Sequence, residues 1–316
     1  MDSAASAPLQ SIVLARHVPL LGLYVVIATL ATTFTLYFAL GHNAGPRPGC
    51  TAASTDVWCT NSTRTLPMIS DTLWRPPEGF IGRWGLITGA NTMPPAMWML
   101  AKLNAKAASG LPDGGHTGNA LVDFLWSDRL DLAIGVLSTV FCQTVNTVNE
   151  HEEIALGFNY HSSAARAYFL LFSLYMLKLA LRGRFLIRET RKHGVAGVGA
   201  LTGRDAASED RRVREKFGCF LSVCVAIGVT TTLPQPWRVP GQEYKMALCE
   251  YAIELTALVF SFSAANDLGN LGLDEALRLD PEWTWGGLCG KGQGTALREN
   301  FVVAPAAGDP ETPAPQ

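Results

Sequence analysis

Residues 244–268 form an apolar segment that is long enough to cross a lipid bilayer and yet contains two glutamates. The hydrocarbon core of a bilayer is about 30 Å thick, which about 20 helical residues span. Glu250 and Glu254 lie four positions apart, so a helix places both carboxylates on one face. Because a carboxylate that faces lipid costs several kcal/mol, we expect this face to lie inside a bundle. The segment therefore predicts an all-α, polytopic membrane protein with a polar interior.

The composition also favours a membrane protein, because only 16% of the 316 residues are charged and 48% are hydrophobic. A soluble domain carries about 25% charged residues. The formal net charge of −2 gives no reason to expect a nucleic-acid partner. The sequence contains no zinc-site spacing of Cys and His, no phosphate-binding glycine loop and no nucleophile elbow, so neither a metal nor a cofactor is predicted.

Six segments of the chain are predicted to span the membrane. The first is uncharged and exceeds the hydrophobic region of a signal peptide, which is about 7–15 residues long; we expect a retained span, with a cleaved signal peptide as the alternative. Pro94 and Pro95 predict a kink in the second span. The six segments are residues 18–40, 82–103, 130–148, 167–181, 217–233 and 244–268.

The distribution of basic residues predicts that both termini are cytosolic. Residues 182–216 contain ten Arg and Lys against five Asp and Glu, and such basic loops stay in the cytosol. The expected organisation is a cytosolic N-terminal segment at 1–17, a six-span domain at 18–268 and a cytosolic tail at 269–316. The tail is rich in Gly, Ala and Pro, and we expect it to be largely disordered.

With this orientation, the loop after the first span lies in the lumen. It contains Asn61 in an Asn-Ser-Thr glycosylation acceptor. It also contains Cys50 and Cys59, which are able to pair in an oxidising compartment. Both features agree with a lumenal loop, although each one alone is weak.

The same orientation brings several polar residues toward the lumen, namely Asp71, Glu150, His161 and Glu250. A His beside carboxylates at a membrane interface is able to bind a lipid head group or act as general acid or base. The candidate catalytic residues are therefore Glu150, His161 and Glu250. The alternative is that Glu150 and His161 are ordinary solvated loop residues. Asp267 is most simply an interfacial residue at the end of its helix.

Three sequence blocks resemble the FRAG–DRAM–SFK group of six-span eukaryotic membrane proteins. The first is LPMISDTLWRPPEGFIGRW at 66–84. The second is Glu150 and His161 followed by YFLLFSLYML at 168–177, and the third is CEYAIELTALVFSFSAANDL at 249–268. The blocks occur in the family's order and on the expected side of the membrane.

The resemblance is closest to the branch of post-GPI-attachment-to-proteins factors. It implies a Golgi or endoplasmic reticulum protein that acts in lipid remodelling of glycosylphosphatidylinositol (GPI) anchors, with membrane lipids, GPI-anchored proteins and other membrane proteins as expected partners. It does not decide between an enzyme and an accessory factor. The family-motif or lipid-site residues that it implies, beside the candidate catalytic ones, are Pro67, Ser70, Asp71, Trp84, Glu254 and Asp267.

Two other functions stay open. Ile69–Asp71 is more similar to the DRAM and SFK branches, which implies a non-enzymatic adaptor: a lysosomal modulator of autophagy, or a plasma-membrane recruiter of a phosphatidylinositol kinase. The basic loop and the tail would then carry the function. A small transporter that uses the intramembrane carboxylates ranks last, because the sequence shows no inverted repeat.

Overall fold

The structure is a computed structural model that describes residues 13–43, 67–73, 75–115, 119–125, 127–148, 160–232 and 242–278. In these ranges the regular structure is helical, apart from one isolated bridge between Leu14 and Gly272, so the predicted all-α class is confirmed. The helices are α1 (His17–Ala39), η1 (Ser70–Leu73), α3 (Glu78–Ala90), α4 (Met93–Ser109), η2 (Pro112–Gly115), α5 (Ala120–Leu125), α6 (Asp128–Thr147), α8 (Tyr160–His193), α9 (Val198–Leu201), α10 (Ala206–Thr232), α11 (Gln242–Leu268) and α12 (Leu273–Arg278).

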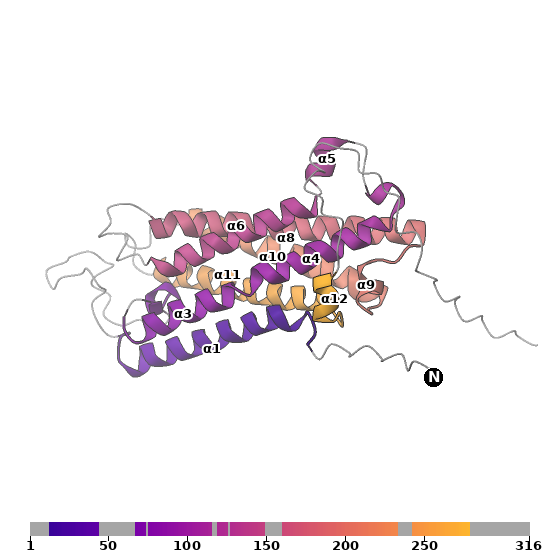
Figure 1. Ribbon diagram of the computed structural model, residues 1–316. Helices are drawn as coiled ribbons and strands as arrows, with labels where there is room; N and C mark the ends of the chain where they lie inside the picture. The colour runs from indigo at the N-terminus through magenta and orange to yellow at the C-terminus, as the bar shows by residue number, and fades with distance from the viewer. Residues whose placement is uncertain are drawn as a thin grey trace, which may run out of the picture. The chain divides into compact units, whose positions relative to one another are not determined.

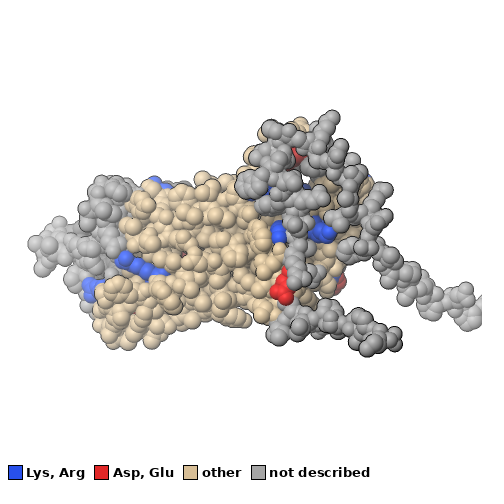
Figure 2. Space-filling model, in the orientation of Figure 1, with Lys and Arg blue, Asp and Glu red and all other residues tan. Residues whose placement is uncertain are grey.

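The long helices run along one common axis and form a bundle (Figure 1). Four of them are long and apolar enough to cross a membrane: α1, α6, residues 163–193 of α8 and residues 245–268 of α11. In Figure 2, a broad band without charged residues separates the charges that gather near the two ends of the bundle. The chain is therefore a multi-pass membrane protein.

The predicted second span is divided into α3 and α4. Asn91 and Thr92 interrupt the helix directly before Pro94 and Pro95, which occupy the first turn of α4, where proline needs no hydrogen-bond partner. The side-chain amide of Gln143 on α6 donates to the Asn91 side chain at this break. The expected kink is thus a full interruption, at which the Thr92 hydroxyl donates to the Gly89 carbonyl at 2.8 Å.

Helices α1 and α3 approach each other closely because glycines line their contact. A Cβ atom on Gly85 would overlap the Thr29 side chain, and a Cβ on Gly89 would lie 3.2 Å from the Gly22 carbonyl oxygen. Small residues allow helix backbones to approach in a membrane, where packing supplies much of the association energy. This contact fixes the position of α3, which begins at a residue of the site described below.

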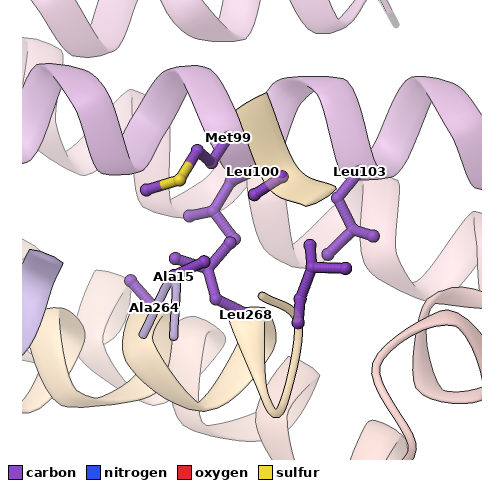
Figure 3. Packing of buried hydrophobic residues seen from close by; sticks show 8 residues of the cluster. Ala15, Met99, Leu100, Leu103, Ala264 and Leu268 are labelled. Atoms are coloured by element: carbon purple, nitrogen blue, oxygen red, sulfur yellow. The ribbon is translucent and has the colours of Figure 1, made fainter. Parts of the chain in front are cut away.

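The end of the bundle that carries residues 13–16 and α12 is called the terminal end here. The Ala15 amide donates to the Leu271 carbonyl at 2.9 Å, and the Leu273 amide donates to the Val13 carbonyl at 2.9 Å. Figure 3 shows a buried apolar cluster at this end, which includes Ala15, Met99, Leu100, Leu103, Ala264 and Leu268. The chain therefore continues past α11 as a packed turn and a short helix.

Buried ion pairs also join helices near the terminal end. Arg182 on α8 contacts Asp128 on α6 at 3.1 Å, and both side chains are less than 10% exposed. One turn along each helix, Lys178 contacts Asp131 at 2.7 Å. Because each charge has a partner, the bundle accommodates them near the apolar band.

Candidate functional site

At the opposite end of the bundle, called the η1 end, the short helix η1 is held against α11 by Glu250. The Ile69 amide donates to the Glu250 carboxylate at 2.8 Å. The Ser70 hydroxyl donates at 3.2 Å and the Ser70 amide at 3.4 Å. The free amide groups at the start of η1 thus point at the Glu250 carboxylate, and negative charge is stabilising at a helix N-terminus.

The next residue of α11 adds a second attachment. The Tyr251 hydroxyl donates to the Pro67 carbonyl at 2.7 Å. Within the docked segment, the Met68 amide donates to Asp71 Oδ2 at 3.0 Å, and Asp71 is only 4% exposed. We call the contacts of Glu250 and Tyr251 with residues 67–70 the η1 clasp. It joins two of the sequence blocks on which the family resemblance rests.

A second polar pair lies at the η1 end and was not foreseen from the sequence. His42 follows α1, and its Nδ1 contacts Oε1 of Glu78, the first residue of α3. The Glu78 side chain is fully buried, whereas the His42 side chain is 20% exposed. Glu78 Oε2 has no hydrogen-bond partner in the part of the chain that the structure describes. The only signal in the sequence was position, since His42 lies two residues after the first predicted span and Glu78 lies four residues before the second.

The His42–Glu78 pair has the chemistry of an acid/base group. A carboxylate on one imidazole nitrogen orients the ring and leaves the other nitrogen to exchange a proton with a bound molecule. Because His42 retains solvent exposure while Glu78 is buried, the histidine is the member of the pair that a substrate can reach. The buried Glu78 then has a positioning role.

His161 stands in the first turn of α8, and its hydrogen bonds go to α6. Its Nδ1 lies 2.6 Å from the Val148 carbonyl oxygen and 3.0 Å from the Val145 carbonyl oxygen. Both acceptors are carbonyls, so Nδ1 carries the proton and caps the end of α6. His161 thus bonds to the end of α6, whereas Glu250 bonds to the start of η1. An acid/base role for His161 stays a prediction.

The other predicted site residues are dispersed. Trp84 is 72% exposed on the outer face of α3. Glu254 is partly buried and lies near Cys142 of α6 and Tyr168 of α8. Asp267 lies in the last turn of α11 at the terminal end and pairs there with Arg212 and Lys216 of α10. Four predicted residues fall outside the described ranges, and what was predicted of them is untested: Glu150, Asn61, Cys50 and Cys59.

Comparison with known families gives one match, and it covers most of the chain. The model of the Frag1/DRAM/Sfk1/Cwh43P N-terminal domain matches residues 15–271. This range includes the η1 clasp, the His42–Glu78 pair and the contact between Ala15 and Leu271. No curated protein and no solved structure matches the chain.

Proposed function

The chain belongs to the family of the Frag1/DRAM/Sfk1/Cwh43P N-terminal domain, and on this premise we propose that it acts in the lipid remodelling of GPI anchors at the lumenal leaflet. In this proposal the bundle has six spans, with α3 and α4 together as one of them and α10 as another. Both termini are cytosolic, because the basic segment 182–216 lies near the terminal end. The η1 end then faces the lumen of the Golgi or endoplasmic reticulum, where GPI lipids reside.

The observation that carries this proposal is the η1 clasp. It connects positions about 180 residues apart in the sequence and fixes the first lumenal segment on a membrane helix. Such a fixed polar surface beside the apolar band suits a ligand with a polar head group and acyl chains. Pro67, Ser70 and Glu250 contribute to the clasp directly, and Asp71 stabilises the turn that it holds.

The His42–Glu78 pair supplies the chemistry in this proposal. Phe80 and Trp84 are both 72% exposed on α3, about half a turn and about two turns beyond Glu78. Exposed aromatic side chains near a helix end are typical of the membrane interface. A lipid whose acyl chains lie against them presents its ester groups near His42, which is placed to exchange a proton during ester cleavage or transfer.

The proposal is tested by measuring the lipid composition of GPI anchors in cells that lack the protein. Rescue with the wild type is compared with rescue by Glu250→Gln and by His42→Ala, at matched protein level. His193→Ala, at the far end of α8, is the control. We expect both variants at the η1 end to fail and the control to rescue. Unchanged anchor lipids in cells without the protein would refute the GPI role.

An adaptor is the second candidate, and one feature of α8 favours it. This helix has 34 residues and is about 51 Å long, which exceeds the hydrocarbon core by about 20 Å. Its last turns carry exposed cations, among them Arg188 at 74% and Lys192 at 67% exposure. If neutralising them abolishes function while Glu250→Gln has no effect, the adaptor replaces the GPI proposal.

A further inference from the structure

A hollow with a volume of about 40 Å³ opens near the terminal end, on the opposite side of the apolar band from the proposed lumenal site. Residues of α4, α8, α9, α10 and α11 line it. Its charged lining residues are Glu209, Arg212, Lys216 and Asp267, and the lining includes apolar side chains of α8 such as Leu179 and Leu186. The hollow is therefore a charged recess bordered by apolar helix surface.

Two buried cations share one carboxylate in this hollow. Arg212 Nη1 lies 3.3 Å from Asp267 Oδ1, and Lys216 Nζ lies 2.5 Å from Asp267 Oδ2. The Arg212 and Lys216 residues are 5% and 3% exposed. A single carboxylate balances only one of two such charges, and a desolvated cation without a counter-charge is costly.

The second acidic residue of the hollow, Glu209, forms a hydrogen bond with α9. Glu209 Oε1 accepts a hydrogen bond from the Gly199 amide, and its carboxyl group lies against that glycine. It thereby caps the first turn of α9. The guanidinium of Arg212 bonds through Nε to the Ser208 carbonyl and through Nη1 to the Asn266 carbonyl. Among the described residues, its Nη2 has no hydrogen-bond partner.

Two further arginines raise the positive charge at the border of the hollow. Arg204 lies beside Gly269, and burial together with the neighbouring Arg212 lowers its pKa. Arg16 also contributes to this shift, and its Nη1 donates to Asn270 Oδ1 at 3.2 Å. Asp267 opposes the shift. Within the described ranges, these four cations thus face three carboxylates, because Asp205 at the start of α10 also interacts with Arg212.

We propose that this hollow binds a phosphate monoester or inorganic phosphate, with Arg212 and Lys216 as its principal contacts. An anion matches the surplus of positive charge among these groups. The open Nη2 of Arg212 and the third proton of Lys216 supply charge-assisted donors, and the Ser263 hydroxyl, 3.2 Å from Lys216 Nζ, is within reach of the same group. Since the hollow lies beside membrane helices, the phosphate belongs either to a lipid head group or to a soluble molecule.

Binding is measured on the full chain in detergent micelles by thermal unfolding and by isothermal titration. The probes are inorganic phosphate, micelles doped with phosphatidate and, as a neutral lipid, micelles doped with phosphatidylcholine. Stabilisation by phosphate and by phosphatidate supports recognition of the phosphate group. Stabilisation by phosphatidate alone supports a lipid head group, and stabilisation by inorganic phosphate alone supports a soluble ligand. No response to either probe overturns the proposal.

Three variants locate the site. Lys216→Gln should weaken binding at least about tenfold, because it removes one of two charge-assisted contacts. Arg211→Gln, an exposed neighbour at 77% on the same helix, should leave binding unchanged. Asp267→Asn should change the affinity for phosphate in the opposite direction. Without an anion this variant should unfold at a lower temperature than the wild type. It should nevertheless bind phosphate at least about tenfold more tightly, because the ligand takes the place of the carboxylate.

The Asp267→Asn result separates a ligand site from a purely structural ion cluster. If this variant is destabilised and phosphate does not restore it, the three groups only join α10 to α11 and the proposal is wrong. If Lys216→Gln and Arg211→Gln weaken binding equally, the anion is held by diffuse surface charge, which also overturns the assignment to the hollow.

Discussion

Replacing Glu250 with alanine should release η1 from α11, and the structure gives the size of the effect. The bond from the Ile69 amide, at 2.8 Å, has ordinary length and a charged acceptor, which is worth about 1.5–3 kcal/mol. The two bonds from Ser70, at 3.2 and 3.4 Å, are long and contribute about 0.5 kcal/mol each. The sum is about 2.5–4 kcal/mol of local stability.

Amide hydrogen exchange of the peptide that covers residues 67–73 measures this loss directly. A change of about 2.5–4 kcal/mol in local opening corresponds to about 60- to 700-fold faster exchange. Glu250→Gln keeps one acceptor oxygen but no charge, so its loss should be about half as large in kcal/mol. Glu254→Gln, one turn along α11, serves as the matched control and should leave the peptide unchanged.

Two outcomes would refute this reasoning. If exchange of residues 67–73 in Glu250→Ala stays within about threefold of the wild type, the clasp is not what holds η1. If Glu254→Gln accelerates exchange as strongly as Glu250→Ala, the effect comes from general loosening of α11 and not from the hydrogen bonds.

Three further predictions concern the scaffold. Gly85→Ala should cost about 1–3 kcal/mol, because its Cβ would overlap Thr29 and force α1 from α3; thermal unfolding in detergent measures this loss. Asp128→Asn should cost about 3–5 kcal/mol by leaving the buried Arg182 charge without its partner, and chemical unfolding measures this. Hydrogen bonds at the start of α10 depress the pKa of Asp205, so its stabilisation is complete above its ordinary pKa of about 3.9 and is lost as pH falls below that value. The unfolding temperature as a function of pH, for the wild type and for Asp205→Asn, measures this effect.

Each of these predictions has a control or a contradicting result. Gly218→Ala, at a helical glycine with open space around it, should be neutral or stabilising, and equal losses at Gly85 and Gly218 would contradict the close-packing account. Adding Arg182→Met to Asp128→Asn should restore part of the stability; no recovery would show that the pair is not coupled. Identical acid profiles for the wild type and Asp205→Asn would contradict the capping role.

The sequence was sufficient for the helical class because long apolar runs have few alternatives in a bilayer. It also identified the face of α11 that carries Glu250, since the spacing of charges on a helix determines which residues share a face. It did not identify the partner of that face. Whether Glu250 contacts η1 or another helix depends on the rotation of α11 about its own axis. The packing of α11 against α1 and α10 determines this rotation, and the sequence of α11 alone does not.

The other features of the site could not be predicted from the sequence either, because they also depend on how the helices pack. His42 and Glu78 are each unremarkable in the sequence, and they become a pair only because glycine contacts bring α1 and α3 together. Asp267 was expected to lie at the end of its helix and at the membrane interface; it lies in the last turn of α11, and the interfacial position stays a prediction. Its two cationic partners, Arg212 and Lys216, are in the first half of α10, in residues that the sequence analysis assigned to the basic loop before the span at 217–233.

The η1 clasp also has a consequence for how the protein is made. The ribosome produces η1 about 180 residues before it produces Glu250. At a synthesis rate of about 5–20 residues per second, that interval is about 10–40 s. The contact between Ala15 and Leu271 at the other end of the bundle has to wait even longer. The first two helices therefore enter the membrane without their final neighbours, and a chain that stops before α11 leaves both ends of the bundle open to chaperones and to membrane proteases.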